Sequence, residues 1–285
     1  AEIAPVVAGI VGATPQIWVT GTSMTLITVD TKLMPVLPLA LRPEAERALV
    51  VAFGMGTTYR TSLIAGLEVD AIELVPSVPM MFRHFYPDAD ERLDDPRGNV
   101  IVADGRNHVE LADETYDIVI VDPPPPIETA GVSVISTVEF YEAAKARLTP
   151  VGVMMQWVPY GQTLDEYLAH VRSFAAAFDR VRVIFGPGGY GTYLLGSDGP
   201  VSLTQAGIIA AITRPGVLED VNSAPDSRGR SAEAWAAQLI ANTWVTDDEV
   251  ARVVGDGPLV TDDRPYPEYF LLRRIVNPDA ERMSP

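Results

Sequence analysis

Short segments of this sequence carry glycine and acidic residues at positions suited to binding and altering a nucleotide-like ligand. The first is ALVVAFGMGTTYRTSL, where Gly54 and Gly56 flank Met55 between a strand-like run and a helix-like run. Glycines at such a place allow a sharp turn and a close backbone approach to a ligand, and the following helix directs N–H groups toward it. A lone Gly-x-Gly is equally typical of a tight turn that binds no ligand.

Acidic residues downstream favour the ligand-binding interpretation. Glu73 ends the strand-like segment VDAIEL, about 20 residues after the turn, where a carboxylate can accept hydrogen bonds from both hydroxyls of a ribose. Asp104 and Gly105 end the next strand-like segment, and Asp104 could accept a hydrogen bond from an adenine amino group. Asp104 also suits a helix N-cap, and the two roles are compatible. The glycine turn and Glu73 alone would also fit NAD, and the Asp104–Gly105 segment is the feature that favours a sulfonium nucleoside.

The segment YDIVIVDPPPPIETAG supplies the candidate catalytic residue, Asp122, at the carboxyl end of another strand. Four successive prolines beginning at Pro123 have fixed φ and no N–H, so they predict a stiff wall that could hold an amine while Asp122 orients it or takes its proton. A rigid loop in which Asp122 only caps amides is the other interpretation. Gln156 and Tyr160, with Trp157 beside them, are expected on the acceptor side, although core packing also suits Trp157.

The elements that must position these residues form a repeating pattern between residues 46 and 200. Continuous apolar strand-like runs alternate there with helix-like runs, which predicts an α/β fold with a doubly wound, mainly parallel sheet. The last two strand-like runs are joined by GPGG, which is too short for a helical crossover, so they should pair antiparallel. This pattern is typical of the class I methyltransferase-like (Rossmann-like) fold.

Two further segments flank the predicted catalytic domain. Residues 1–45 are expected to form a small N-terminal β-strand appendage that ends in a short helix. Residues 201–285 contain helix-like runs and are expected to form a helical C-terminal extension. The proline-rich tail TDDRPYPEYFLLRR should lie extended against the main domain.

Composition excludes several classes of function. The net charge of −17 would repel a phosphate backbone, so nucleic acid is not an expected partner. There is no cysteine, and the three histidines are far apart, so a metal site is not expected. No apolar run approaches the roughly 20 residues of a membrane span, and the first residues lack the charged region of a signal peptide. We therefore expect a soluble, cytoplasmic chain.

Taken together, these segments resemble the spermidine synthase (polyamine aminopropyltransferase) family, and more closely its bacterial members that are fused to membrane-spanning segments. The resemblance rests on VLPLALRP, VVAFGMGTTYRTSL, IELVPSV, DPRGNVIVADGRN, YDIVIVDPPPP, EFYEAAKARLTPVGVMMQW and TDDRPYPEY. It implies aminopropyl transfer from decarboxylated S-adenosylmethionine to an amine such as putrescine, with release of methylthioadenosine. Glu73 would then bind ribose, Asp104 and Gly105 adenine, and Asp122 would assist deprotonation of the amine. The resemblance also implies a homodimer, or the cytoplasmic domain of a longer membrane protein.

The sequence departs from this family at positions that bind amines. Met55 replaces an acid that holds the amino end of the aminopropyl group, and Pro125 replaces a second acid near Asp122. Asp30 and Thr31 stand where a Tyr-Gln pair is usual, and Asp30 is a candidate replacement anchor for the amine. Three hypotheses follow: an aminopropyltransferase with an altered acceptor, a methyltransferase that uses S-adenosylmethionine, and a nucleoside-binding domain without catalysis.

Overall fold

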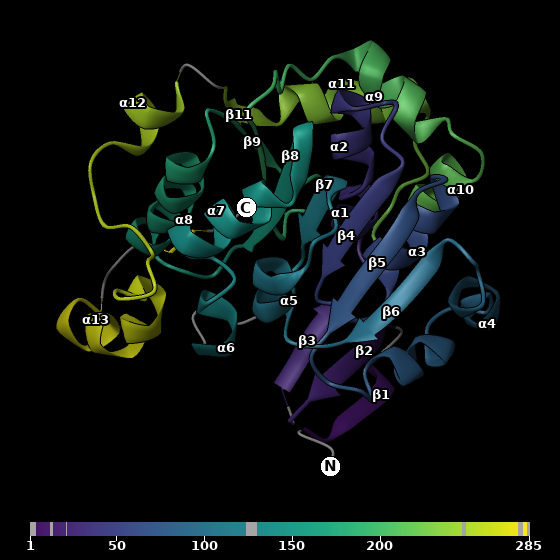
Figure 1. Cartoon of the computed structure of the whole chain (residues 1–285), viewed down its shortest axis with the longest axis horizontal. Helices are drawn as coiled ribbons and strands as arrows, with labels where there is room; N and C mark the ends of the chain where they lie inside the picture. Colours follow the sequence, from purple (N-terminus) through teal and green to yellow (C-terminus); the bar gives the residue numbers. More distant parts are fainter. Residues whose placement is uncertain are drawn as a thin grey trace.

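A mixed sheet forms the centre of the molecule, in a computed structural model that describes residues 4–11, 14–20, 22–123, 130–246, 249–278 and 282–283. In that part of the chain the sheet has eight strands in the order β11-β9-β10-β8-β7-β4-β5-β6 (Figure 1). The strands are β4 (Arg47–Val51), β5 (Glu68–Glu73), β6 (Gly98–Val102), β7 (Tyr116–Val121), β8 (Leu148–Pro159), β9 (Arg180–Phe185), β10 (Gly191–Ser197) and β11 (Thr243–Val245). Strands β4 to β8 pair in parallel, whereas β10 pairs antiparallel with both β8 and β9. The predicted class I methyltransferase-like fold and its antiparallel hairpin are confirmed.

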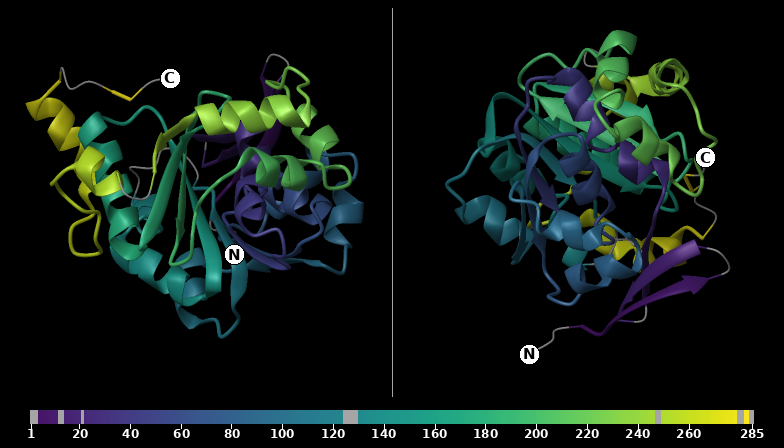
Figure 2. Two further views of the ribbon diagram at one scale, coloured as in Figure 1. Left: turned by 90° about the horizontal axis from the view of Figure 1, so that it is seen from above. Right: turned by 90° about the vertical axis from the view of Figure 1, so that its right-hand side faces the viewer.

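Helices cover both faces of this sheet, which explains why its inner strands are apolar along their whole length (Figure 2). One face packs against α1 (Val29–Leu33), α2 (Val36–Leu41), α3 (Thr57–Ile64), α9 (Gln205–Ile212), α10 (Val217–Asn222) and α11 (Ala232–Ala241). The other face packs against α5 (Gly105–Leu111), α7 (Val138–Ala146), α8 (Leu164–Ala177) and α12 (Val250–Val254). Between β5 and β6 lie the 3₁₀ helix η1 (Pro79–His84) and α4 (Ala89–Leu93).

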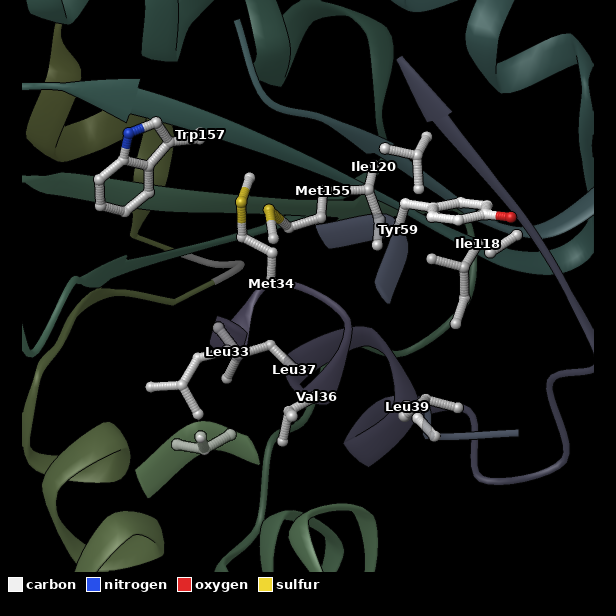
Figure 3. Packing of buried hydrophobic residues seen from close by; sticks show 14 of the residues in the cluster. Leu33, Met34, Val36, Leu37, Leu39, Tyr59, Ile118, Ile120, Met155 and Trp157 are labelled. Carbon is white, nitrogen blue, oxygen red and sulfur yellow. The ribbon is translucent and has the colours of Figure 1, made fainter. Parts of the chain in front are cut away.

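The N-terminal residues divide between two structures. Strands β1 (Val6–Val11), β2 (Thr14–Val19) and β3 (Thr22–Leu26) form a separate antiparallel sheet that extends from the main body (Figure 2). The following helices, α1 and α2, instead pack into the core of the main body, where Met34 at the end of α1 lies beside Met155 of β8 (Figure 3). At the other end of the chain, β11 extends the main sheet. The domain boundaries at residues 45 and 200 therefore stay a prediction. Elements before residue 45 share a core with the main sheet, and β11, after residue 200, belongs to that sheet.

The expectation of an extended tail was wrong. The segment forms a 3₁₀ helix, η2 (Tyr266–Tyr269), and then α13 (Phe270–Val276). Pro267 lies in the first turn of η2, where its fixed φ and missing N–H are compatible with a helix. Within the described ranges, no helix combines the length and apolar character needed to cross a bilayer.

A buried network of charges joins α1, α3 and α10. The Lys32 ammonium lies 2.5 Å from Asp220, and both side chains are at most 2% exposed. Asp220 also accepts hydrogen bonds from Arg60 and, at 2.6 Å, from the Thr61 hydroxyl. Burial lowers the pKa of Lys32 although Asp220 opposes this shift. These contacts tie the N-terminal helices to a segment nearly 190 residues later in the chain.

The turn between β4 and α3 needs glycine at position 56. Gly56 has φ +75°, and a Cβ atom there would lie 2.5 Å from Cδ2 of Phe82. We expect Gly56→Ala to destabilise the fold by about 2–4 kcal/mol, from a left-handed conformation and from overpacking. Gly66→Ala is the matched control, because Gly66 also has positive φ but no atom within 4 Å. Urea unfolding should show the smaller loss in the control, and equal losses would contradict a steric role for Phe82.

Candidate active site

A cavity of about 460 Å³ lies at the carboxyl ends of the parallel strands. Its walls come from the turns after β4 to β8, from β2 and β3 of the N-terminal sheet, from α1, and from the segment that follows α6 (Ala130–Ser133). Strand order reverses between β4 and β7, so the cavity lies at the topological switch point where α/β folds bind ligands. Its volume suits a nucleoside together with a small second ligand.

The strand order arranges the predicted residues along this edge. The cavity is lined by seven of them: Gly54, Met55, Glu73, Asp104, Gly105, Asp122 and Pro123. Gly56 lies in the same turn, between the lining residues Met55 and Thr57. Asp122 directly follows β7, at the middle of the row; Glu73 at the end of β5 and Asp104 after β6 lie to one side, and Trp157 of β8 lies to the other. The structure therefore separates the predicted nucleoside residues from the predicted acceptor side, with Asp122 between them.

Glu73 is held by the backbone around it. Its carboxylate accepts hydrogen bonds from the N–H of Gly54 at 3.3 Å and of Val75 at 2.9 Å. Burial raises the pKa of Glu73, and these backbone bonds act in the opposite direction. A carboxylate has about four lone-pair sites, so this one can still accept hydrogen bonds from a ligand in the cavity.

We expect Glu73→Gln to weaken nucleoside binding about tenfold, because hydrogen bonds to a charged group are replaced by weaker ones to a neutral amide. Calorimetric titration with methylthioadenosine measures the change. Glu68→Gln is the control, since Glu68 lies at the other end of the same strand with its side chain 63% exposed. Equal affinities for the two variants would show that Glu73 does not contact the nucleoside.

Asp122 is a half-buried carboxyl whose protonation is poised near neutral pH. Burial raises the pKa of Asp122 to about 7, and a hydrogen bond from the Thr58 hydroxyl acts in the opposite direction. The adjacent Pro123 also lines the cavity, whereas the rest of the predicted proline wall lies outside the described residues. A carboxyl in this state can accept a proton from a bound amine.

Asp104 and its neighbours form the far end of the cavity. Asp104 caps α5 by accepting a hydrogen bond from the Asn107 N–H at 2.8 Å, while its side chain still lines the cavity. Arg106 is the one cation among the described lining residues, and it binds Asp262 at 2.5 Å and Glu110 at 2.7 Å. The acidic side chains therefore outnumber the cation, which favours cationic ligands.

Three predicted acceptor residues do not line the cavity. Gln156 and Trp157 are neighbours on β8, so their side chains point to opposite faces of the sheet. Trp157 lines the cavity and packs 5.0 Å from the Tyr193 ring, whereas Gln156 is fully buried on the other face. Tyr160 is half-buried, and its backbone N–H donates to the Tyr190 carbonyl at 2.9 Å. Of this pair, both expected on the acceptor side, Trp157 lines the cavity and Gln156 does not.

Asp30, the third predicted acceptor residue that does not line the cavity, lies behind the cavity wall and holds the β9–β10 turn in place. It is 1% exposed, and its carboxylate accepts hydrogen bonds from the N–H of Gly188 at 2.7 Å and of Tyr190 at 3.3 Å. Burial raises its pKa to about 6. Tyr190, which Asp30 positions, does line the cavity, as does Thr31. Sequence reasoning missed Tyr190 because it lies in the β9–β10 turn, whose position depends on a contact with α1.

Two acids of the C-terminal tail contact residues that lie near the cavity. Asp262 pairs with Arg106, and Glu268 accepts a hydrogen bond from Ser133 of α6. Neither acid lines the cavity. Among the described residues, no three histidine or acidic side chains are arranged to hold a metal ion.

Comparison with known proteins identifies the family. The profile described as "Spermine/spermidine synthase domain" matches residues 29–174. The polyamine aminopropyltransferase of Alkaliphilus oremlandii is 26% identical over 153 residues, which are 52% of this chain and 51% of that protein. The chain thus spans about half the length of curated relatives that it matches.

Solved structures agree on the fold. A spermidine synthase in complex with the transition state analogue AdoDATO superposes with a TM-score of 0.63 at 20% identity, covering 82% of this chain and 84% of that one. Human methyltransferase-like protein 13 in complex with SAH gives a TM-score of 0.50 at 19% identity, covering 68% of this chain and 90% of the other. With its profile match across half of its length, its fold and its cavity at the switch point, the chain belongs to the spermine/spermidine synthase family.

Proposed function

We propose that this chain transfers an aminopropyl group from decarboxylated S-adenosylmethionine to an amine. The observation that carries the proposal is Asp122, a carboxyl with a pKa raised to about 7, between a nucleoside side that contains Glu73 and Asp104 and an acceptor side that contains Trp157. An acidic cavity at this place favours both the sulfonium cation and the amine. Family membership supports the reaction type.

The proposed reaction needs only positioning and one proton acceptor. Glu73 and Asp104 hold the ribose and adenine, so that the carbon next to sulfur faces Asp122. Asp122 accepts a proton from the ammonium of the acceptor, which frees the nitrogen lone pair. That nitrogen forms a bond to the carbon as the carbon–sulfur bond breaks, and the electron pair stays on sulfur. Methylthioadenosine and the aminopropylated amine are the products.

Methyl transfer from S-adenosylmethionine is the second candidate, and Met55 is the observation that favours it. Met55 lines the cavity and is 2% exposed, so it offers no carboxylate to the ammonium of an aminopropyl group. S-adenosylmethionine carries its own carboxylate beside this ammonium, and backbone N–H groups at the start of α3 can donate to it.

The two candidates are separated by their products. The purified chain is incubated with either nucleoside and a panel of amines, and both nucleoside products are quantified by mass spectrometry. Amine-dependent methylthioadenosine would establish aminopropyl transfer. S-adenosylhomocysteine would establish methyl transfer instead. If the chain binds a nucleoside but forms neither product, it is a nucleoside-binding domain without catalysis.

A further inference from the structure

The acceptor side of the cavity is apolar over most of its described surface. Beyond Asp122, the wall is formed by Trp157 and Pro159 of β8, by Tyr190 of the β9–β10 turn, and by Met34 at the end of α1. Figure 3 shows Met34 beside Met155, on the side of α1 that faces the sheet. The Thr58 hydroxyl lies 3.6 Å from the Met34 sulfur and is also a hydrogen-bond partner of Asp122, so this wall begins directly beside the candidate proton acceptor.

The two threonine hydroxyls on this wall are paired with one another. The hydroxyls of Thr28 and Thr31 lie 2.8 Å apart, and the Thr28 hydroxyl also accepts from the Thr31 N–H at 3.2 Å. The nearby carboxylate of Asp30 is turned toward the backbone of Gly188 and Tyr190. Among the described lining residues the carboxylates are Glu73, Asp104 and Asp122, and the first two lie on the nucleoside side.

We infer that the acceptor is an amine with one cationic nitrogen and an apolar body, and not a diamine. This inference rests on the proposed aminopropyl transfer. Asp122 binds the attacking nitrogen, and the apolar body lies along Met34, Trp157 and Tyr190. A second ammonium at the far end of the acceptor would lose its water without meeting a carboxylate among the described residues of this wall, which is unfavourable. An apolar end placed there gains from the same burial.

Aromatic side chains offer a weaker alternative for a second cation. Trp157 and Tyr190 could each face an ammonium, but a cation–π contact is weaker than a charge-assisted hydrogen bond to a carboxylate. The wall therefore favours an apolar acceptor body over a charged one.

The test compares two amines that differ only at the distal end. Putrescine and pentylamine are unbranched chains with the same number of non-hydrogen atoms, and pentylamine has a methyl group where putrescine has its second ammonium. With decarboxylated S-adenosylmethionine as donor, methylthioadenosine release gives kcat/KM for each amine. We expect pentylamine to exceed putrescine by about 10- to 100-fold, the factor that one lost charge-assisted hydrogen bond corresponds to.

Each outcome is informative. A kcat/KM for putrescine equal to or above that for pentylamine would overturn this inference, while the methylthioadenosine formed would still support aminopropyl transfer. No methylthioadenosine with either amine would instead overturn the proposed function.

A pair of variants tests where the acceptor body lies. Thr31→Asp places a carboxylate on the wall, and Thr31→Asn is its neutral counterpart of similar size. The aspartate variant should shift the kcat/KM ratio at least about tenfold toward putrescine relative to the asparagine variant. Equal ratios in two variants that both retain the wild-type Tm would show that the acceptor does not run along this wall.

Discussion

Asp122→Asn should lower kcat for aminopropyl transfer by about 10²- to 10⁴-fold, the range that general-base catalysis contributes. The amide has the size of the carboxyl but cannot accept the proton of the attacking amine. Nucleoside affinity should be retained, because Glu73 and Asp104 are unchanged. Steady-state kinetics and calorimetric titration with methylthioadenosine measure the two effects. Glu114→Gln, an exposed acid before the same strand, is the control.

The stability of the Asp122→Asn variant should also differ from that of the wild type in its dependence on pH. The folded-state pKa of Asp122 is about 7, above the ordinary 3.8, so the stability contributed by its protonated form is lost as pH rises from about 4 to 7. The asparagine variant lacks this loss. Its Tm should therefore rise relative to wild type between pH 4 and pH 8. A pH-independent difference in Tm, together with undiminished kcat, would rule out a buried proton acceptor at this position.

Asp220→Ala should destabilise the fold by about 3–5 kcal/mol, the usual cost of removing one partner of a buried ion pair. The loss leaves the Lys32 ammonium, with its side chain 1% exposed, in contact with the Ser223 hydroxyl at 3.1 Å and with the Tyr86 ring, whose centroid is 5.6 Å away. Arg60 retains Asp88 at 2.8 Å and should contribute less to the loss. Thermal unfolding followed by circular dichroism should show Tm lowered by roughly 10 °C.

An exposed ion pair provides the control for this prediction, and a double variant tests its physical cause. Asp90→Asn removes the partner of Arg83, and both of these side chains are more than half exposed, so Tm should change little. Lys32→Met combined with Asp220→Ala removes both buried charges and should recover part of the lost stability. A double variant less stable than Asp220→Ala would indicate that Lys32 stabilises the fold without its partner.

The sequence pattern was sufficient to predict the fold and the residues on the side of the cavity that contains Glu73, Asp104 and Asp122. Buried parallel strands are continuous apolar runs, and their carboxyl ends meet at one edge of the sheet. Residues that end such runs, including Glu73, Asp104 and Asp122, are therefore found at the cavity from the pattern alone. Their roles in binding and catalysis remain predictions.

The acceptor side could not be derived in this way. Choosing between Gln156 and Trp157 requires knowing which face of β8 each side chain points to, and both faces are buried. Ile17 reaches the cavity from a separate sheet, and the Tyr190 backbone N–H donates a hydrogen bond to Asp30, which precedes it by 160 residues. Contacts at such sequence separations have no local signal in a single sequence.

The two sides of the cavity come from different stretches of the chain, which has an evolutionary consequence. The proposed nucleoside side comes from residues 52–57, 72–75 and 104–106, and the proposed acceptor wall from residues 28–34, 157–159 and 190. Substitutions can accumulate in the second set while selection preserves the first, so a gene copy can acquire a new nucleophile without losing its alkyl donor. The loss of acidic residues beside a retained donor site is the trace that such divergence would leave.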